Sequence, residues 1–178
     1  AFGKKAYLDK ALQNARFLET NLINDDYSVN RVYKDGEANI QGVLTDYSYT
    51  INAFIHLYEV TMDKKWLKLA KNMAANTVTH FYEERSGLFV FKNQQSEAFI
   101  ANNRELADKT KPAGNSAMAK ALVKLGHYFY KQHGGYVDTA KAMLSTATER
   151  IEQAPSYFGT WLQVMSYFAE TPLEVAVI

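Results

Sequence analysis

The chain has 178 residues, of which 47% are hydrophobic and 22% are charged, proportions that are ordinary for one globular domain and exclude a disordered tail. Lys and Arg together number 20 and Asp and Glu 19, so the formal net charge of +1 gives no electrostatic case for binding nucleic acid or an acidic membrane surface. The sequence has no cysteine, which excludes disulfides, thiol nucleophiles and thiolate metal sites within this chain.

The two ends of the sequence resemble cut points. The chain opens on Ala1 without a signal-peptide pattern, and no apolar run approaches the roughly 18 residues of a membrane span. We therefore predict an excised piece of a cytoplasmic protein with no membrane partner. Residues 173–178 are rich in β-branched side chains and follow Pro172, which predicts a strand. We expect residues 1–172 to form the domain and residues 173–178 to begin a further segment.

Three segments share one amphipathic pattern and are predicted to be helices with one solvated face. Each has an aromatic residue, then an aliphatic residue, then Ala four positions after the aromatic, with small or apolar residues at helical spacing beyond it. The segments cover residues 6–22, 65–81 and 135–151, and their shared aromatic residues are Tyr7, Trp66 and Tyr136.

Three further segments, residues 47–60, 117–130 and 157–168, are apolar around most of a helical circumference. A helix of that kind belongs in the interior of a protein. A residue type that caps helices stands near the start of each, and these residues are Asp46, Asn115 and Ser156. The chain therefore alternates a half-solvated outer helix with a buried inner helix.

This alternation is typical of αα-hairpins, which can close into a ring with the inner helices around a central cavity. Residues 28–41 and 88–100 precede inner helices and are predicted to form small β-hairpins, the first around a Lys34-Asp35-Gly36 turn. The predicted fold is all-α: a partial (α/α) toroid of about three αα-hairpins with two short β-hairpin insertions. Loops at one end of such a scaffold are where sites usually form.

Five short motifs resemble, in order, the helical region of the YyaL/spermatogenesis-associated protein 20 family of thioredoxin-domain-containing proteins. They are residues 31–36 (RVYKDG), 42–47 (GVLTDY), 57–61 (LYEVT), 104–108 (RELAD) and 112–116 (PAGNS). The family usually has Asp-Asp-Tyr-Ala at positions 45–48 and Ser at position 113, where this chain has TDYS and Ala. The family's cysteine-bearing thioredoxin-like domain is absent, so no redox role can be placed on these residues.

The resemblance implies a toroid similar to those of glycosidases and sugar 2-epimerases, and it suggests chemistry only by analogy of fold. On that basis Asp46 and Asp108 are the candidate catalytic pair, because two carboxylates at one cavity mouth can act as acid and base on a sugar. The simpler interpretation is that each caps a helix or turn. Arg104 is a candidate substrate ligand, or it pairs internally with Glu105 or Asp108.

The remaining candidate ligands of a saccharide or other small polar molecule lie near the expected mouth. They are Arg31, Tyr33 and Tyr47, with Tyr49 beside them, and Asn115 and Ser116 at the start of an inner helix. The alternatives are core packing for the tyrosines and helix capping for Asn115. His56 shares a helical stripe with Asn52 and Glu59, and is expected to be either a base or, more simply, a buried structural histidine.

The histidines show no metal-ligand spacing and the glycines form no phosphate-binding loop, so we expect no metal and no cofactor. Two functional hypotheses remain. The first is a carbohydrate-active domain of isomerase or hydrolase type, and the second is a non-catalytic helical domain that binds a partner or supports a separate thioredoxin-like domain. A partial toroid would expose apolar inner surface, which also predicts a homodimer.

Overall fold

The computed structural model describes residues 3–92, 104–130 and 135–169. Six α-helices lie within these ranges, together with one short 3-10 helix, Pro155–Tyr157. The α-helices are α1 (Lys5–Asn21), α2 (Leu44–Thr61), α3 (Lys64–Phe81), α4 (Gly114–Tyr128), α5 (Tyr136–Gln153) and α6 (Gly159–Ala169). They match the six helices predicted from the sequence, in the same order.

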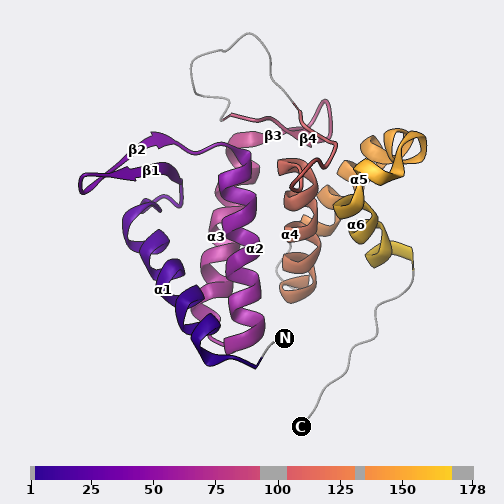
Figure 1. The fold of residues 1–178 in the computed structure, drawn as a ribbon. Helices are drawn as coiled ribbons and strands as arrows, with labels where there is room; N and C mark the ends of the chain where they lie inside the picture. The colour runs from indigo at the N-terminus through magenta and orange to yellow at the C-terminus, as the bar shows by residue number, and fades with distance from the viewer. Residues whose placement is uncertain (1–2, 93–103, 131–134, 170–178) are drawn as a thin grey trace.

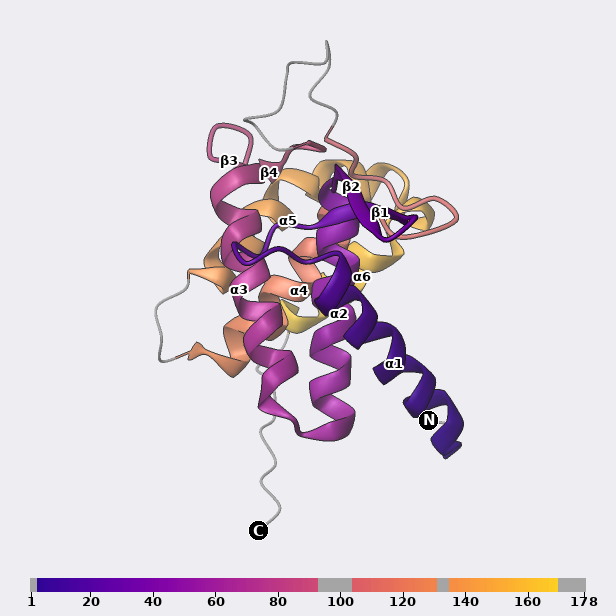
Figure 2. The ribbon, with the colours of Figure 1, turned by 90° about the vertical axis from the view of Figure 1, so that its left-hand side faces the viewer.

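The helices form the two rows that the alternation predicts. Helix α4 packs between α2 and α6, so these three make the inner row, while α3 packs on α2 and α5 packs on α4 from the outer side (Figure 1). Helix α1 lies at one edge and runs obliquely across α2 with far less contact than α3 makes (Figure 2). The described structure is therefore a partial (α/α) toroid, as predicted.

The outer helices α3 and α5 bury the stripe that their shared sequence pattern predicts. In α5 the buried residues are Tyr136, Ala140, Met143, Ala147 and Ile151, spaced three or four apart on one face, and α3 buries the equivalent stripe from Trp66 to Phe81. Helix α1 carries the same pattern, yet Ala15 is its only buried residue. The inner helix α4 is buried around most of its circumference between its neighbours.

Two antiparallel β-hairpins precede inner helices, as predicted, but the second is shifted along the chain. Strands β1 (Asn30–Lys34) and β2 (Glu37–Gln41) pair through a turn at Asp35 and Gly36, which both have positive φ. The other hairpin pairs β3 (Tyr82–Glu83) with β4 (Leu88–Phe89), so residue 88 begins its second strand, and residues 93–100 of the predicted hairpin lie outside the described residues. Its first strand follows α3 directly, so the periodic helical pattern runs up to the strand and gives no sign of it.

The inner helices begin differently from the sequence prediction. Helix α2 begins at Leu44, which places Asp46 at its third residue, and Asn115 is the second residue of α4. Ser156 lies in the 3-10 helix before α6. The N-cap residues Val43 and Ala113 have no capping side chain of their own, and Asp46 supports the start of α2 from within the helix by accepting from the Val43 N–H.

The N-terminal ends of the inner helices meet at the end of the molecule that carries both β-hairpins (Figure 1). The Leu44 N–H at the start of α2 donates to the Phe91 carbonyl, just after β4. The predicted strand at residues 173–178 lies outside the described residues. None of the helices in the described ranges is long and apolar enough to cross a membrane.

Candidate functional site

Asp108 joins the starts of two inner helices. One carboxylate oxygen, Oδ1, accepts hydrogen bonds from the Ala113 N–H at 2.8 Å and the Ser116 hydroxyl at 2.6 Å, at the start of α4. The other, Oδ2, accepts from the Thr160 N–H at 2.7 Å, at the start of α6. The positive ends of both helix dipoles stabilise this buried carboxylate. Asp108 therefore caps α4 and α6 together.

Three of the predicted ligand residues lie inside the protein with their polar groups satisfied. The Asn115 side chain accepts from the Phe89 N–H at 2.9 Å and donates to the Phe89 carbonyl at 3.0 Å, which attaches β4 to α4. Ser116 donates to Asp108, and the fully buried Tyr47 hydroxyl accepts from the Val29 N–H at 3.1 Å. The structure places these residues beneath the mouth, where they hold its segments together.

Asp46 and Arg31 face a hollow at the mouth. The Asp46 Oδ2 atom accepts from the Val43 N–H at 2.9 Å and lies 3.6 Å from Arg31 Nε. The hollow has a volume of about 240 Å³, and its polar lining includes Arg31, Asp46, Tyr49 and Lys111. The Asp46 side chain is 26% exposed, so a ligand in the hollow can reach it. Arg31, Asp46 and Tyr49 are the candidates from the sequence that line this hollow together.

Tyr33 and Arg104 lie apart from this hollow. The Tyr33 ring packs edge-on against Phe17 of α1, with ring centroids 5.2 Å apart. Arg104 forms an ion pair with Glu83 of β3, and Lys109 pairs with Glu105, so the internal partner that the sequence suggested for Arg104 is wrong. Hydrogen bonds from Ser86 and Arg104 hold the pKa of Glu83 below its usual value. The contact between Arg104 and Glu83 joins residues 21 positions apart along the chain.

A second hollow, of about 440 Å³, lies on the concave face of the inner row, where the alternation of helices predicts a cavity, although most of its lining residues were not among the candidates. All three inner helices contribute to its walls, with Tyr49, Asn52 and His56 from α2, Lys120 from α4 and Gln163 from α6. Tyr49 lines both hollows, so they are neighbours along α2. Its hydroxyl donates to the Pro112 carbonyl, which holds the ring between them. Burial raises the pKa of Tyr49 and keeps the hydroxyl protonated.

The polar groups of the concave face are held by contacts between helices. The Asn52 amide donates to the Ala117 carbonyl of α4 at 2.8 Å, and the Lys120 ammonium donates to the Gln163 side-chain carbonyl of α6 at 2.7 Å. These contacts fix side chains that would otherwise sample several rotamers. A preformed wall of amide and ammonium groups suits a ligand with many hydroxyls.

Deeper along the same face, Glu59 links α2 to α4. Its Oε1 atom accepts from the Lys124 ammonium at 2.8 Å and from the Tyr128 hydroxyl at 3.3 Å. Burial, followed by the negative charge of Glu59, raises the pKa of Tyr128 to about 12. His56 lies between this group and the hollow, and burial together with the charge of Lys124 lowers its pKa.

The His56 side chain is 55% exposed, so the expectation of a buried structural histidine is wrong. His56 faces the concave side of the inner row, whereas the apolar pattern of residues 47–60 predicted that this helix lies in the interior. The signal that could have found the second hollow is the spacing of its polar residues. Tyr49, Asn52, His56 and Glu59 repeat every three or four residues on α2, as Lys120 and Lys124 do on α4.

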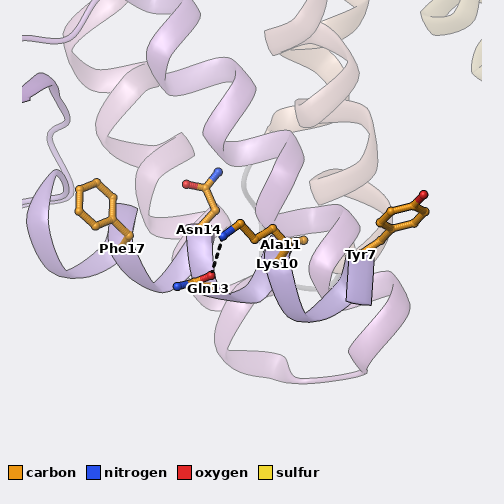
Figure 3. Close-up of a pocket in the computed structure, with 6 residues that line it drawn as sticks. All are labelled: Tyr7, Lys10, Ala11, Gln13, Asn14 and Phe17. Atoms are coloured by element: carbon orange, nitrogen blue, oxygen red, sulfur yellow. Dashed lines mark hydrogen bonds between the residues drawn. The ribbon is translucent and has the colours of Figure 1, made fainter. Parts of the chain in front are cut away.

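Two other hollows involve α1. One, of about 730 Å³, lies between α1 and α2 and is mostly apolar, with Leu8, Leu18, Leu57 and Val60 among its lining residues. The other is an open face of α1 alone, where Tyr7 and Phe17 stand at opposite ends and Lys10 contacts only Gln13 (Figure 3). Because a single helix supplies that face, it makes no enclosed site. No group of three potential metal ligands exists among the described residues.

Comparison with known proteins agrees with this geometry. Residues 6–157 match the family model described as the beta-L-arabinofuranosidase GH127 catalytic domain. The chain belongs to this family. As a GH127-family chain it contains an inner helical row of the glycosidase type, which is the row that carries the mouth hollow and the hollow of the concave face.

Relatives in sequence and structure extend this assignment. Spermatogenesis-associated protein 20 of Mus musculus is 21% identical over 189 residues, covering 99% of this chain and 23% of that protein. Its Homo sapiens counterpart is 20% identical over 137 residues, covering 76% and 17%. The chain thus spans less than a quarter of these relatives, and the family resemblance predicted from sequence motifs is confirmed.

Among solved structures, a GH76 alpha-mannanase of Bacteroides thetaiotaomicron superposes with a TM-score of 0.72 at 15% identity. The match covers 96% of this chain and 48% of the mannanase chain. At that identity the likeness concerns the fold alone, and it confirms that the GH127-family chain has the architecture of about half of an α/α toroid protein.

Proposed function

We propose that the mouth and the concave face of the inner row bind a saccharide. The observation that carries the proposal is that two neighbouring hollows share Tyr49. The mouth hollow has Arg31, Asp46 and Lys111 in its lining, and the second hollow is lined by residues of α2, α4 and α6. Membership of a family described by a glycosidase catalytic domain supports a sugar as the ligand class. A flat aromatic ring flanked by amide and charged groups is suited to a sugar ring, since the apolar face stacks and the hydroxyls form hydrogen bonds.

In this proposal the residues of the two hollows have different roles. The Tyr49 ring stacks on the sugar, and Asn52, Lys120 and Gln163 contact its hydroxyl groups. At the mouth, Asp46 and Arg31 contact the next part of the ligand. Tyr33, Tyr47, Arg104, Asn115 and Ser116, which the sequence also nominated, stay predictions as direct ligands, and their contacts support roles in positioning the mouth.

If the chain is catalytic, Asp46 is the carboxylate that we propose to react with the sugar. Glycoside hydrolysis uses two carboxylates, one acting as an acid and the other as a base or nucleophile. Asp46 is open to its hollow, whereas both oxygens of Asp108 are held by three donors. The catalytic role of Asp108 therefore stays a prediction, and its capping contacts favour the simpler interpretation.

The test is a saccharide titration of the 178-residue chain. Calorimetry measures the affinity, and NMR measures the chemical-shift changes of the backbone amides of α2, α4 and α6. We expect shifts at Tyr49, Asn52 and Lys120. Tyr49→Ala should weaken binding about tenfold because it removes the stacking ring. The matched variant Tyr49→Phe keeps the ring and loses only the hydroxyl contact with Pro112, so it should retain most of the affinity. Shifts confined to α1, or equal affinity in both variants, would contradict the proposal.

A second function is favoured by the contacts of Asp108 and Asn115. These residues use their polar groups to join segments of this chain, as expected of a non-catalytic helical domain that supports another domain. The chain also spans less than a quarter of its relatives, which leaves room for such a partner domain. In that case none of the saccharides titrated would shift the NMR resonances of the residues on the concave face. A homodimer through the apolar hollow and a cytoplasmic location stay predictions.

A further inference from the structure

Four cations lie along the concave face and its mouth: Arg31, Lys111, Lys120 and Lys124. The negative charges of Asp108 and Glu105 also act on Tyr49, and the carboxylates paired with these cations are Asp46 and Glu59. Asp46 pairs with Arg31, and Glu59 pairs with Lys124. Among the described residues, neither Lys111 nor Lys120 has a carboxylate within ion-pair distance.

Lys120 is the more enclosed of the two. Its side chain leaves α4 into the second hollow, is partly buried, and donates to the neutral side chain of Gln163. Burial and the nearby charge of Lys124 lower its pKa, while Glu59 acts in the opposite direction. The same two lysines contribute to the lowered pKa of His56 across the hollow. Lys120 is therefore a cation within the hollow whose hydrogen-bond partner is a neutral amide.

Lys111 stands at the other end of the same path. It lines the mouth hollow, and its ammonium lies 5.9 Å from the centre of the Tyr49 ring. The two lysines without a carboxylate partner thus each line a hollow that includes Tyr49, the residue whose ring is proposed to stack on a sugar. An anionic group attached to that sugar would meet a cation at the stacking site.

We propose that the saccharide bound by this face carries an anionic substituent, either a carboxylate or a phosphate, and that Lys120 is its main contact. This inference rests on the proposed function and specifies the ligand class. The amides of Asn52 and Gln163 contact the hydroxyls, and Lys111 provides a second contact at the mouth. An ammonium suits both kinds of anion, because it is a compact charge with three donors.

The experiment compares three probes that share one sugar ring: D-glucose, D-glucuronate and D-glucose 6-phosphate. Each is titrated into the 178-residue chain, and inorganic phosphate is included to separate a sugar site from a simple anion site. We expect at least one of the two anionic sugars to bind about tenfold more tightly than glucose, since a charged hydrogen bond is stronger than a neutral one. The two anionic probes distinguish a carboxylate from a phosphate substituent.

Two variants test the assigned contact. Lys120→Gln removes the charge from the hollow and should reduce the preference for the anionic sugar over glucose about tenfold. Lys68→Gln makes the same change on the exposed face of outer helix α3, where it should have no effect. NMR spectra of both variants establish that the fold is retained.

Each outcome separates this inference from the proposed function. If glucose and both anionic sugars bind with equal affinity, the anionic ligand is overturned and saccharide binding stands. If the two lysine variants behave alike, Lys120 is not the main contact and the inference is wrong on that point. If inorganic phosphate binds as tightly as glucose 6-phosphate, the sugar ring contributes nothing and the inference is wrong. If none of the sugars binds, the proposed function fails and this inference fails with it.

Discussion

At the scale of single residues, Asp108 shows how one side chain can set the position of a whole mouth. Its carboxylate accepts hydrogen bonds from the starts of α4 and α6. Thr160, at the start of α6, lies 52 residues after Asp108 in the chain. Tyr49, Lys120 and Gln163 stand on the helices whose ends meet here. The geometry of the concave hollow therefore depends on a carboxylate that does not line it.

We expect Asp108→Asn to lower the free energy of unfolding by about 2–3 kcal/mol. The amide has a single acceptor oxygen, so its NH2 group must face one of the N–H donors at Ala113 and Thr160. The replacement also removes a negative charge from two helix N-termini. Urea denaturation at neutral pH measures the loss.

The control for this variant is Asp46→Asn. Asp46 has a comparable place near a helix start but a more exposed carboxylate, so its loss should cost less than about 1 kcal/mol. Equal stability of the two variants would mean that Asp108 does not join α4 to α6 in solution. A large loss of saccharide affinity in Asp46→Asn, with stability retained, would support its proposed place at the mouth.

At the scale of elements, the contact between α4 and α5 depends on a glycine. A Cβ atom added to Gly126 would lie 2.4 Å from Val137 Cγ2 and 3.3 Å from the Val137 backbone nitrogen. Gly126→Ala should therefore destabilise the protein by about 1–2 kcal/mol, even though alanine favours a helix, because the two helices must separate. Thermal or urea unfolding measures the change.

Two further variants make this prediction specific. Gly159→Ala, at the first residue of α6, adds a Cβ atom that meets nothing within 4 Å, and it should be neutral or slightly stabilising. Adding Val137→Ala to Gly126→Ala removes the clashing methyl group, so the double variant should recover part of the loss. Additive effects of the two substitutions would show that Gly126 and Val137 do not meet.

Helix type and order were predictable from the sequence because they depend on local periodicity. The stripes that begin at Trp66 and Tyr136 are buried as predicted, and the polar spacing from Tyr49 to Glu59 was already visible on α2. What the sequence could not supply was the contact of residues far apart in the chain. Nothing local indicates that Asp108 reaches Thr160 or that Arg104 pairs with Glu83.

For the same reason, the candidate site was predicted only in part. Asp46 and Arg31 lie next to a predicted turn and a helix start, so their proximity follows from the local chain. Predicting the concave hollow requires the knowledge that α4 packs between α2 and α6, and that the polar residues of all three helices face the same side. The polar stripe on α2 cannot be assigned to a shared hollow until the helices that face it are known.

At the scale of the whole molecule, the row of inner helices is half of the ring to which it is similar, since the match covers 48% of the mannanase chain. An incomplete ring has two open edges. One of them is the α1 and α2 edge, where α1 makes little contact and a mostly apolar hollow of about 730 Å³ separates the helices. Val60 lines this hollow and is 63% exposed, with Met62 close by at 69%.

We expect the 178-residue chain to associate through this edge, because burying exposed apolar surface is favourable and a second copy offers the same surface. Light scattering should show an average mass that rises with concentration toward a dimer. Val60→Lys places a charge in the contact and should keep the chain monomeric. Ile40→Lys changes a similarly exposed apolar residue on β2, remote from the hollow, and should leave the association unchanged. A single monomeric mass at millimolar concentration would show that this edge does not self-associate.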